Sequence, residues 1–162
     1  MIRFVLILFV IGLTTMGPNN AMTEELKLHP VGKVHKAGNV TALEVFPEYR
    51  DALQGLEGFS HVIVVYWFDR NDTPEKRSTL RVHPRGDRRN PLTGVFATRS
   101  PVRPNLIGLS TCEIRSVEPG RVLITGIDAY DGTPIIDLKP YIPGNDCVPA
   151  AEVPGWVKRD RK

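Results

Sequence analysis

The chain has 162 residues, of which 41% are hydrophobic and 24% are charged. This balance excludes a wholly disordered protein and suits one domain around a single core. The formal net charge of +3 permits an anionic partner, such as a nucleic acid, but does not identify one. The 14 prolines and 14 glycines favour many short elements joined by turns over long helices.

The N-terminal residues 1–21 are a separate apolar segment. The apolar run Ile2–Leu13 is too short for a transmembrane helix, which needs about 20 residues. A positive residue, a short apolar run and the small Ala21 resemble a signal peptide. Alternatively, Met22 is the true start and the preceding residues are an extended gene start. We expect the globular domain to cover residues 22–148, followed by a basic tail at 149–162.

The first elements of the domain are short. Leu26–Val34 alternates loosely between apolar and polar residues and predicts a strand, and Val40–Phe46 predicts a second. Residues 47–53 are a candidate helix, because a proline stands at its start and Gly55 follows its end.

Phe59–Phe68 is the strongest predicted strand of the chain. Within it, Val62–Phe68 is apolar on both faces, which predicts a central strand covered on both sides. Residues 69–90 then form a long, charged stretch, which we interpret as an irregular loop with one short strand at 80–82.

Four more short strands are predicted in the second half, at residues 94–98, 107–117, 122–129 and 133–138. Many short strands and few helical periods predict a mostly β protein, with an antiparallel sheet or barrel. Cys112 and Cys147 are too few for a four-ligand zinc site, so we expect ordinary thiols and no metal.

The segment after residue 94 carries two arginines on a stiff loop. Pro101 and Pro104 fix their own φ angles and bias the preceding residues to extended conformations. Arg99 and Arg103 are therefore held in a loop that loses little entropy on binding. A guanidinium group suits a carboxylate or a phosphate, although a surface ion pair is an equally good explanation.

A second conspicuous turn lies at Asp131–Gly132, between two apolar strands, and predicts a hairpin. Its carboxylate is suited to accept hydrogen bonds from sugar hydroxyls or an amino group of a ligand. The alternative is that Asp131 only closes the turn, as aspartate often does.

Two long motifs make the chain resemble the TsaA/TrmO family of tRNA N6-adenosine methyltransferases. They are Phe-Ala-Thr-Arg-Ser-Pro-x-Arg-Pro-Asn-x-Ile-Gly from Phe96 and Asp-Gly-Thr-Pro-x-x-Asp-x-Lys-Pro-Tyr from Asp131. The resemblance covers about residues 28–146 and implies a compact antiparallel β-barrel with short helices and long loops. It also implies a homodimer that binds S-adenosyl-L-methionine (SAM). The absence of a Gly-x-Gly-x-x-Gly motif agrees with a methyltransferase unlike the Rossmann type.

The resemblance also implies roles for single residues. The predicted cofactor-binding residues are Arg99, Leu109, Asp131, Gly132, Thr133 and Pro134. Arg103 and Asn105 are predicted to bind the substrate, which in this family is threonylcarbamoyl-adenosine at position 37 of tRNA. Its N6 carries an acidic, urea-like proton, so a modest base could assist the transfer. Asp69 and His61 are the candidates for this base.

Basic residues gather between residues 76 and 89, where Arg85, Arg88 and Arg89 are the predicted contacts to tRNA. Lys76, Arg77 and Arg81 add to the same run, which suits phosphate binding. The alternative is a solvated loop without a partner. A cytoplasmic location follows from a tRNA substrate and SAM, although the N-terminal segment leaves export open.

Departures from the family pattern keep other functions open. Many members carry a Pro-Arg-Gln motif that is missing around His35–Asn39, and many have a histidine where this chain has Asp69. One alternative is a methyltransferase of the same fold that acts on another RNA or a small molecule. Others are a non-catalytic SAM-binding module and an exported binding protein.

Overall fold

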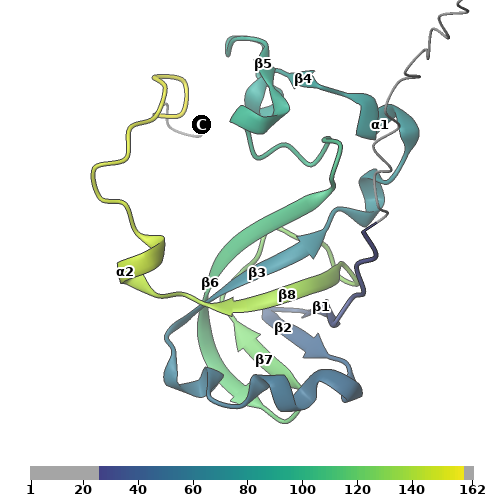
Figure 1. Cartoon of the computed structure of the whole chain (residues 1–162), viewed down its shortest axis with the longest axis vertical. Helices are drawn as coiled ribbons and strands as arrows, with labels where there is room; N and C mark the ends of the chain where they lie inside the picture. Colours follow the sequence, from purple (N-terminus) through teal and green to yellow (C-terminus); the bar gives the residue numbers. More distant parts are fainter. Residues whose placement is uncertain (1–25, 159–162) are drawn as a thin grey trace, which may run out of the picture.

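A closed six-stranded barrel is the body of the molecule (Figure 1). The computed structural model describes residues 26–158, so the predicted segment 1–21 and the last residues of the predicted tail lie outside the described part. Around the barrel the antiparallel strands are β1 Gly32–Ala37, β2 Val40–Val45, β7 Arg121–Ile124, β6 Ile107–Glu118, β3 His61–Trp67 and β8 Pro134–Pro140. Pairing of β1 with both β2 and β8 closes the barrel, as the predicted fold class required.

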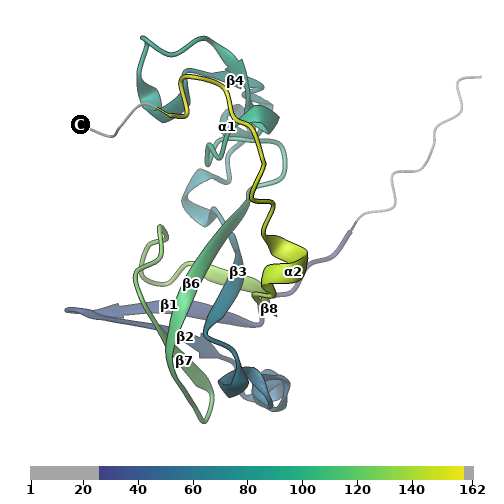
Figure 2. The same ribbon diagram turned by 90° about the vertical axis from the view of Figure 1, so that its left-hand side faces the viewer.

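Short helices and a small sheet fill the connections between the barrel strands. The two-stranded sheet consists of β4 Arg81–Val82 and β5 Thr93–Gly94 and lies in a separate lobe above the barrel (Figure 1). The α-helices are α1 Pro74–Ser78 and α2 Pro143–Asp146, and the 3-10 helices are η1 Pro47–Leu53, η2 Leu56–Gly58, η3 Asp69–Asn71, η4 Pro84–Gly86 and η5 Val95–Ala97. The chain after α2 returns along the outside to this lobe (Figure 2).

The core lies inside the barrel, and β3 contributes to it with every second residue. Val62, Val64 and Tyr66 are buried, whereas the residues between them are only partly buried. The predicted central strand is confirmed, since β3 pairs with both β6 and β8. The prediction that β3 is covered on both faces is wrong. The outward face of a closed barrel is buried only where a second layer packs on it, and the outward residues of β3 are only partly buried.

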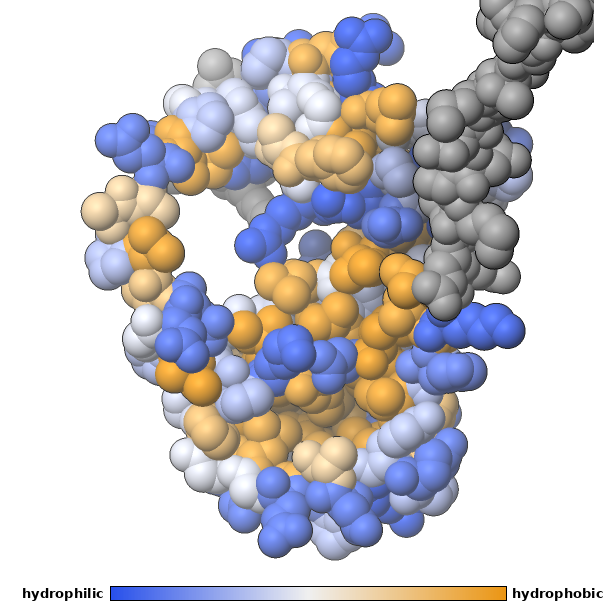
Figure 3. Space-filling view, in the orientation of Figure 1, coloured by the Kyte–Doolittle hydropathy of each residue, from blue (hydrophilic) through white to orange (hydrophobic). Residues whose placement is uncertain are grey.

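Apolar side chains are also visible from outside the barrel. In the orientation of Figure 1, hydrophobic residues gather over the barrel strands and hydrophilic ones over its lower end (Figure 3). Between residues 26 and 158, no helix combines the length and the apolar character that a membrane crossing requires. Within the same range, no group of three or more His, Cys, Asp and Glu residues could hold a metal ion.

Several predicted element boundaries are wrong for local reasons. The first strand begins at Gly32 and not at Leu26, whose side chain is 87% exposed and has no sheet to cover it. The strand expected at 94–98 is mostly the helix η5, because the Thr98 N–H and hydroxyl both donate to the carbonyl of Val95. The strand expected at 122–129 ends at Ile124, and the hairpin expected at Asp131–Gly132 is wrong, because β8 pairs with β1 and β3 and not with β7.

The pairing of β3 with β8 contains a bulge. Val65 lies opposite Asp137, but the next residue, Tyr66, lies opposite Ile135, so Ile136 is an extra residue in β8. Both Ile135 and Leu138 therefore contact the core, although they are three positions apart and strict alternation would put them on opposite faces. A bulge of this kind changes which side chains face inward.

Candidate functional site

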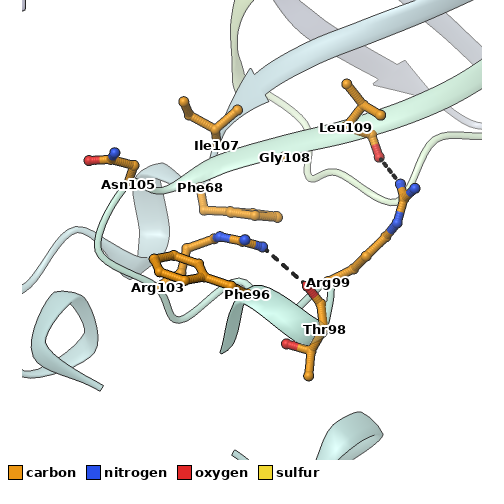
Figure 4. Close-up of a pocket in the computed structure, with 9 residues that line it drawn as sticks. All are labelled: Phe68, Phe96, Thr98, Arg99, Arg103, Asn105, Ile107, Gly108 and Leu109. Carbon is orange, nitrogen blue, oxygen red and sulfur yellow. Dashed lines mark hydrogen bonds between the residues drawn. The ribbon is translucent and has the colours of Figure 1, made fainter. Parts of the chain in front are cut away.

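The predicted site segments meet at the upper end of the barrel, around two neighbouring pockets. Each has a volume of about 430 Å³, which is in the range of small-molecule sites. We call the first the arginine pocket, which is lined by Phe68, Phe96, Thr98, Arg99, Arg103, Asn105, Ile107, Gly108 and Leu109 (Figure 4). We call the second the aromatic pocket, which is lined by Lys36, Tyr66, Trp67, Phe68, Asp69, Arg70, Asn71, Arg99, Pro101, Asp128, Ala129, Tyr130 and Thr133.

Arg99 and Phe68 belong to the walls of both pockets. The guanidinium of Arg99 donates to the carbonyl oxygen of Leu109 at 3.3 Å, which ties the loop to β6 (Figure 4). Phe68 follows β3 directly, and its N–H donates to the carbonyl of the buried Leu106 at 2.8 Å. The two pockets are therefore adjacent chambers with a common wall of one cation and one aromatic ring.

The loop that carries the arginines holds its shape with its own polar groups. The Thr98 hydroxyl accepts from the N–H of Ser100 at 3.2 Å, and the Ser100 hydroxyl accepts from the N–H of Val102 at 3.3 Å. The Arg103 guanidinium lies 3.5 Å from the carbonyl of Thr98, between the rings of Phe68 and Phe96 in the view of Figure 4. This agrees with the stiff loop that the prolines predict.

Tyr66 forms the floor of the aromatic pocket and joins three elements. Its hydroxyl donates to the carbonyl of Asp128 at 3.0 Å and lies 3.3 Å from the Ser110 hydroxyl. Burial raises the pKa of this phenol. A Cβ at Gly108, the cross-strand partner, would overlap the ring, so only glycine leaves room for it. Tyr66 thereby fixes the segment at Asp128 over the pocket.

The Asp131 turn is fastened to β1. Its carboxylate accepts from the Lys36 N–H at 2.8 Å and lies 3.5 Å from Nδ1 of His35. The hydrogen bond from Lys36 lowers the pKa of the Asp131 carboxyl, with smaller contributions from His35 and Lys33. This carboxylate therefore ties the turn to β1, and its role toward a ligand stays a prediction. Gly132 has a φ of 82°, which suits glycine at this turn.

Not every predicted site residue lies at these pockets. Arg99, Arg103, Asn105, Leu109, Asp69 and Thr133 do, whereas Asp131, Gly132 and Pro134 belong to the adjoining turn and the start of β8. His61 begins β3 and lies about 20 Å along the strand from Trp67, next to the Ser60 hydroxyl at 2.9 Å. The structure thus separates His61 from the other candidates.

The predicted tRNA contacts lie on the lobe of β4 and β5, outside both pocket walls. The Arg89 guanidinium binds both carboxylate oxygens of Asp87, with a shortest distance of 2.7 Å. Arg85 donates to the carbonyl of Val157 at 3.0 Å, and Arg88 is exposed on the same loop. Two of the three arginines are therefore engaged by groups of this chain.

Sequence reasoning missed most of the aromatic pocket. The sequence pattern predicts Tyr66 and Trp67 only as strand residues and assigns no role to Lys36, Arg70 and Tyr130. Arg70 lies over the Tyr130 ring at 4.1 Å from its centroid, which makes them one wall. The available signal was position, because Tyr66 and Trp67 end β3 and Tyr130 directly precedes the Asp131 turn.

Comparisons with known proteins identify the family. The family model described as the tRNA-methyltransferase O N-terminal domain matches residues 22–147. A probable S-adenosyl-L-methionine-binding protein of Methanocaldococcus jannaschii is 49% identical over 120 residues, which are 74% of this chain and 95% of that protein. A protein of Pyrococcus horikoshii with the same description is 45% identical over 124 residues, 76% of this chain and 88% of its own length. The cofactor predicted from the sequence is the ligand in both names.

The barrel also matches a solved structure. The crystal structure of TrmO from Pseudomonas aeruginosa superposes with a TM-score of 0.64 and 31% identity. The match covers 82% of this chain and 62% of that chain, so this chain spans less than two thirds of the solved protein. Because the family model covers most of the chain and the relatives are nearly half identical, this protein belongs to the family of the tRNA-methyltransferase O N-terminal domain.

Proposed function

We propose that this protein transfers a methyl group from SAM to N6 of threonylcarbamoyl-adenosine at position 37 of tRNA. The observation that carries the proposal is the common wall of the two pockets, which Arg99 and Phe68 form. Two adjacent chambers suit a reaction that joins a donor and an acceptor. Family membership and the SAM-binding relatives support the same chemistry.

The aromatic pocket suits the donor. Lys36 and Arg99 offer cations for a methionine carboxylate, and the rings of Trp67 and Tyr130 offer faces for an adenine. The carboxylate of Asp128 can accept from ribose hydroxyls or from an ammonium group. This set of charged and aromatic groups fits SAM, which supplies an activated methyl group when it is bound.

The arginine pocket suits the acceptor. Its walls carry Arg99 and Arg103 but no carboxylate, which favours a ligand with a negative charge. The threonyl carboxylate beside N6 is such a group. Phe96 is 80% exposed at this pocket and offers a face on which a nucleobase can stack. Asn105 adds a donor and an acceptor for a base edge.

The protein contributes alignment, a water-poor wall and a proton acceptor. The stiff loop holds Arg99 and Arg103 in fixed positions, so that they can align the acceptor with the donor. Such alignment lowers the barrier to transfer more than tight binding alone does. When the new bond to N6 forms, the proton on that nitrogen must leave. We assign it to the carboxylate of Asp69, which lies in the pocket wall next to Phe68. His61 is too far along β3 for this task.

Three further proposals follow from this function. Arg85, Arg88 and Arg89 contact the phosphates of tRNA from the outer lobe, so affinity should fall with salt. We also propose a homodimer, as the resemblance to the TsaA/TrmO family implies. A protein that uses tRNA and SAM works in the cytoplasm.

The test is a methyl-transfer assay with the full chain, labelled SAM, and tRNA with and without the threonylcarbamoyl group. Nucleoside mass spectrometry should find one new methyl on the modified adenosine only. Arg99→Ala should weaken SAM binding by about tenfold in calorimetry, because a charge-assisted hydrogen bond is lost. Arg81→Ala is the matched control, since this exposed arginine of β4 lies outside both pockets.

The alternatives give other outcomes. Methylation of a different RNA or of a small molecule would keep the donor site and replace the substrate. SAM binding without any transfer would favour the non-catalytic module. Asp69→Asn should lower kcat while leaving the Kd of SAM within a few-fold of that of the unmodified chain, and an unchanged kcat would remove Asp69 as the base.

A further inference from the structure

Arg77 in α1 joins the ends of three segments that surround the two pockets. Its Nε donates to Asp72 at 2.7 Å and its Nη2 to the second oxygen of that carboxylate at 3.1 Å. Its Nη1 donates to the carbonyl of Pro104 at 3.0 Å. The guanidinium also lies over the Trp67 ring, 5.3 Å from its centroid. Each of its three nitrogens is therefore directed at a group of this chain.

The contact to Pro104 fixes the loop at the arginine pocket. Pro104 stands between Arg103 and Asn105, and both of these line that pocket. A proline offers no N–H, so its carbonyl is the backbone group through which a neighbour can hold it. Arg77 supplies that neighbour from the segment after β3.

The contact to Asp72 reaches the other pocket. Asp72 also accepts from the indole Nε1 of Trp67 at 3.2 Å, and Trp67 lines the aromatic pocket. The same carboxylate therefore orients one ring of the aromatic pocket and the guanidinium that holds the arginine loop. Thr73 caps α1 by accepting from the Lys76 N–H at 3.3 Å, so Arg77 stands on an ordered turn.

We propose that Arg77 is a positioning residue for the acceptor, which acts through the carbonyl of Pro104 and does not contact nucleic acid. The inference rests on the proposed function, because it takes the arginine pocket as the acceptor site. Arg77 therefore has a different role from the other basic residues between 76 and 89, which the sequence predicts to bind phosphates. Bidentate pairing with Asp72 leaves this guanidinium a poor partner for a phosphate, since a carboxylate already faces it.

Two substitutions distinguish positioning from phosphate binding. Lysine keeps the charge but cannot span Asp72 and Pro104 together, whereas methionine removes the charge and keeps only an apolar stem. Positioning predicts that Arg77→Lys and Arg77→Met both raise the KM for tRNA or lower kcat, by about tenfold in kcat/KM. The Kd of SAM and the salt dependence of tRNA binding should not change. Arg115→Lys and Arg115→Met are the matched controls, because this exposed arginine of β6 pairs with Glu113 and lies outside both pockets and the basic run.

A phosphate contact predicts the opposite pattern. Arg77→Lys would then keep the activity of the wild-type chain, because lysine also binds a phosphate. Arg77→Met would lower the slope of log affinity against log salt by about one. Either result overturns the proposal.

Hydrogen exchange gives a readout that does not need activity. Arg77→Lys should speed amide exchange at residues 105–107, where the loop runs into β6, and leave β3 unchanged. Unaltered exchange there overturns the positioning role even if the wild-type chain is active. If the wild-type chain methylates no tRNA, the proposed function fails and the acceptor role fails with it. Faster exchange would then still show the contact to Pro104 in solution.

Discussion

Replacing Gly108 by alanine should destabilise the barrel by about 3 kcal/mol. The added carbon would lie 2.6 Å from Cζ of Tyr66 and 2.8 Å from Cδ2, whereas carbon atoms pack at roughly 3.5 Å or more. The ring must therefore move by about 1 Å, and overpacking of this size costs about 1–3 kcal/mol. The same movement breaks the 3.0 Å hydrogen bond to Asp128, which adds about 1 kcal/mol.

Urea unfolding of the full chain measures this effect. With an m-value of roughly 2 kcal/mol per molar, the midpoint should fall by about 1.5 M without a change in slope. Gly94→Ala is the control, because no atom lies within 4 Å of its added carbon and its φ of −59° suits any residue. A Gly108→Ala midpoint equal to that of the control would refute the close packing of Tyr66 on β6.

Three smaller changes test other parts of the site. Tyr66→Phe keeps the ring but removes the hydroxyl, and should cost about 1 kcal/mol in urea unfolding and weaken SAM binding in calorimetry. Gly132→Ala meets no neighbour within 4 Å, so its cost of about 1 kcal/mol should come only from its φ of 82°. The Asp131 carboxyl has a folded pKa below its ordinary 3.8, so its contribution to stability is present above that pH and is lost as the pH falls through the folded pKa. The stability difference between wild type and Asp131→Asn should accordingly shrink from pH 6 to pH 3, and a constant difference would contradict this contact.

Local sequence patterns predicted where the strands and turns lie better than which side chains of a strand face the core. The apolar run that became β3 and the turn at Glu118–Gly120 between β6 and β7 are visible in the sequence, because each depends on neighbouring residues. The order of strands around the barrel depends on contacts between distant segments, such as β1 with β8. A continuous apolar run cannot tell a strand covered on both faces from one that closes a barrel.

The site was predicted where motifs carry it and missed where only packing reveals it. Arg99 and Arg103 stand in a long motif, and the structure places both at one pocket. Tyr66 is one of six consecutive apolar residues in β3, and its role depends on Gly108 and Asp128, which are distant in sequence. Arg77 looked like one charge in a basic run because its partner Pro104 lies 27 residues away.

The bulge in β8 makes the length of that strand as important as its composition. Counted in strict alternation from Ile135, the inward positions would be Asp137 and Lys139, and two charged groups would enter an apolar barrel. The extra residue, Ile136, shifts the count so that Leu138 faces the core opposite Val64. Deleting Ile136 would therefore remove the bulge and leave Leu138 facing inward, whereas inserting one more residue there would move every later side chain of β8 to the opposite face.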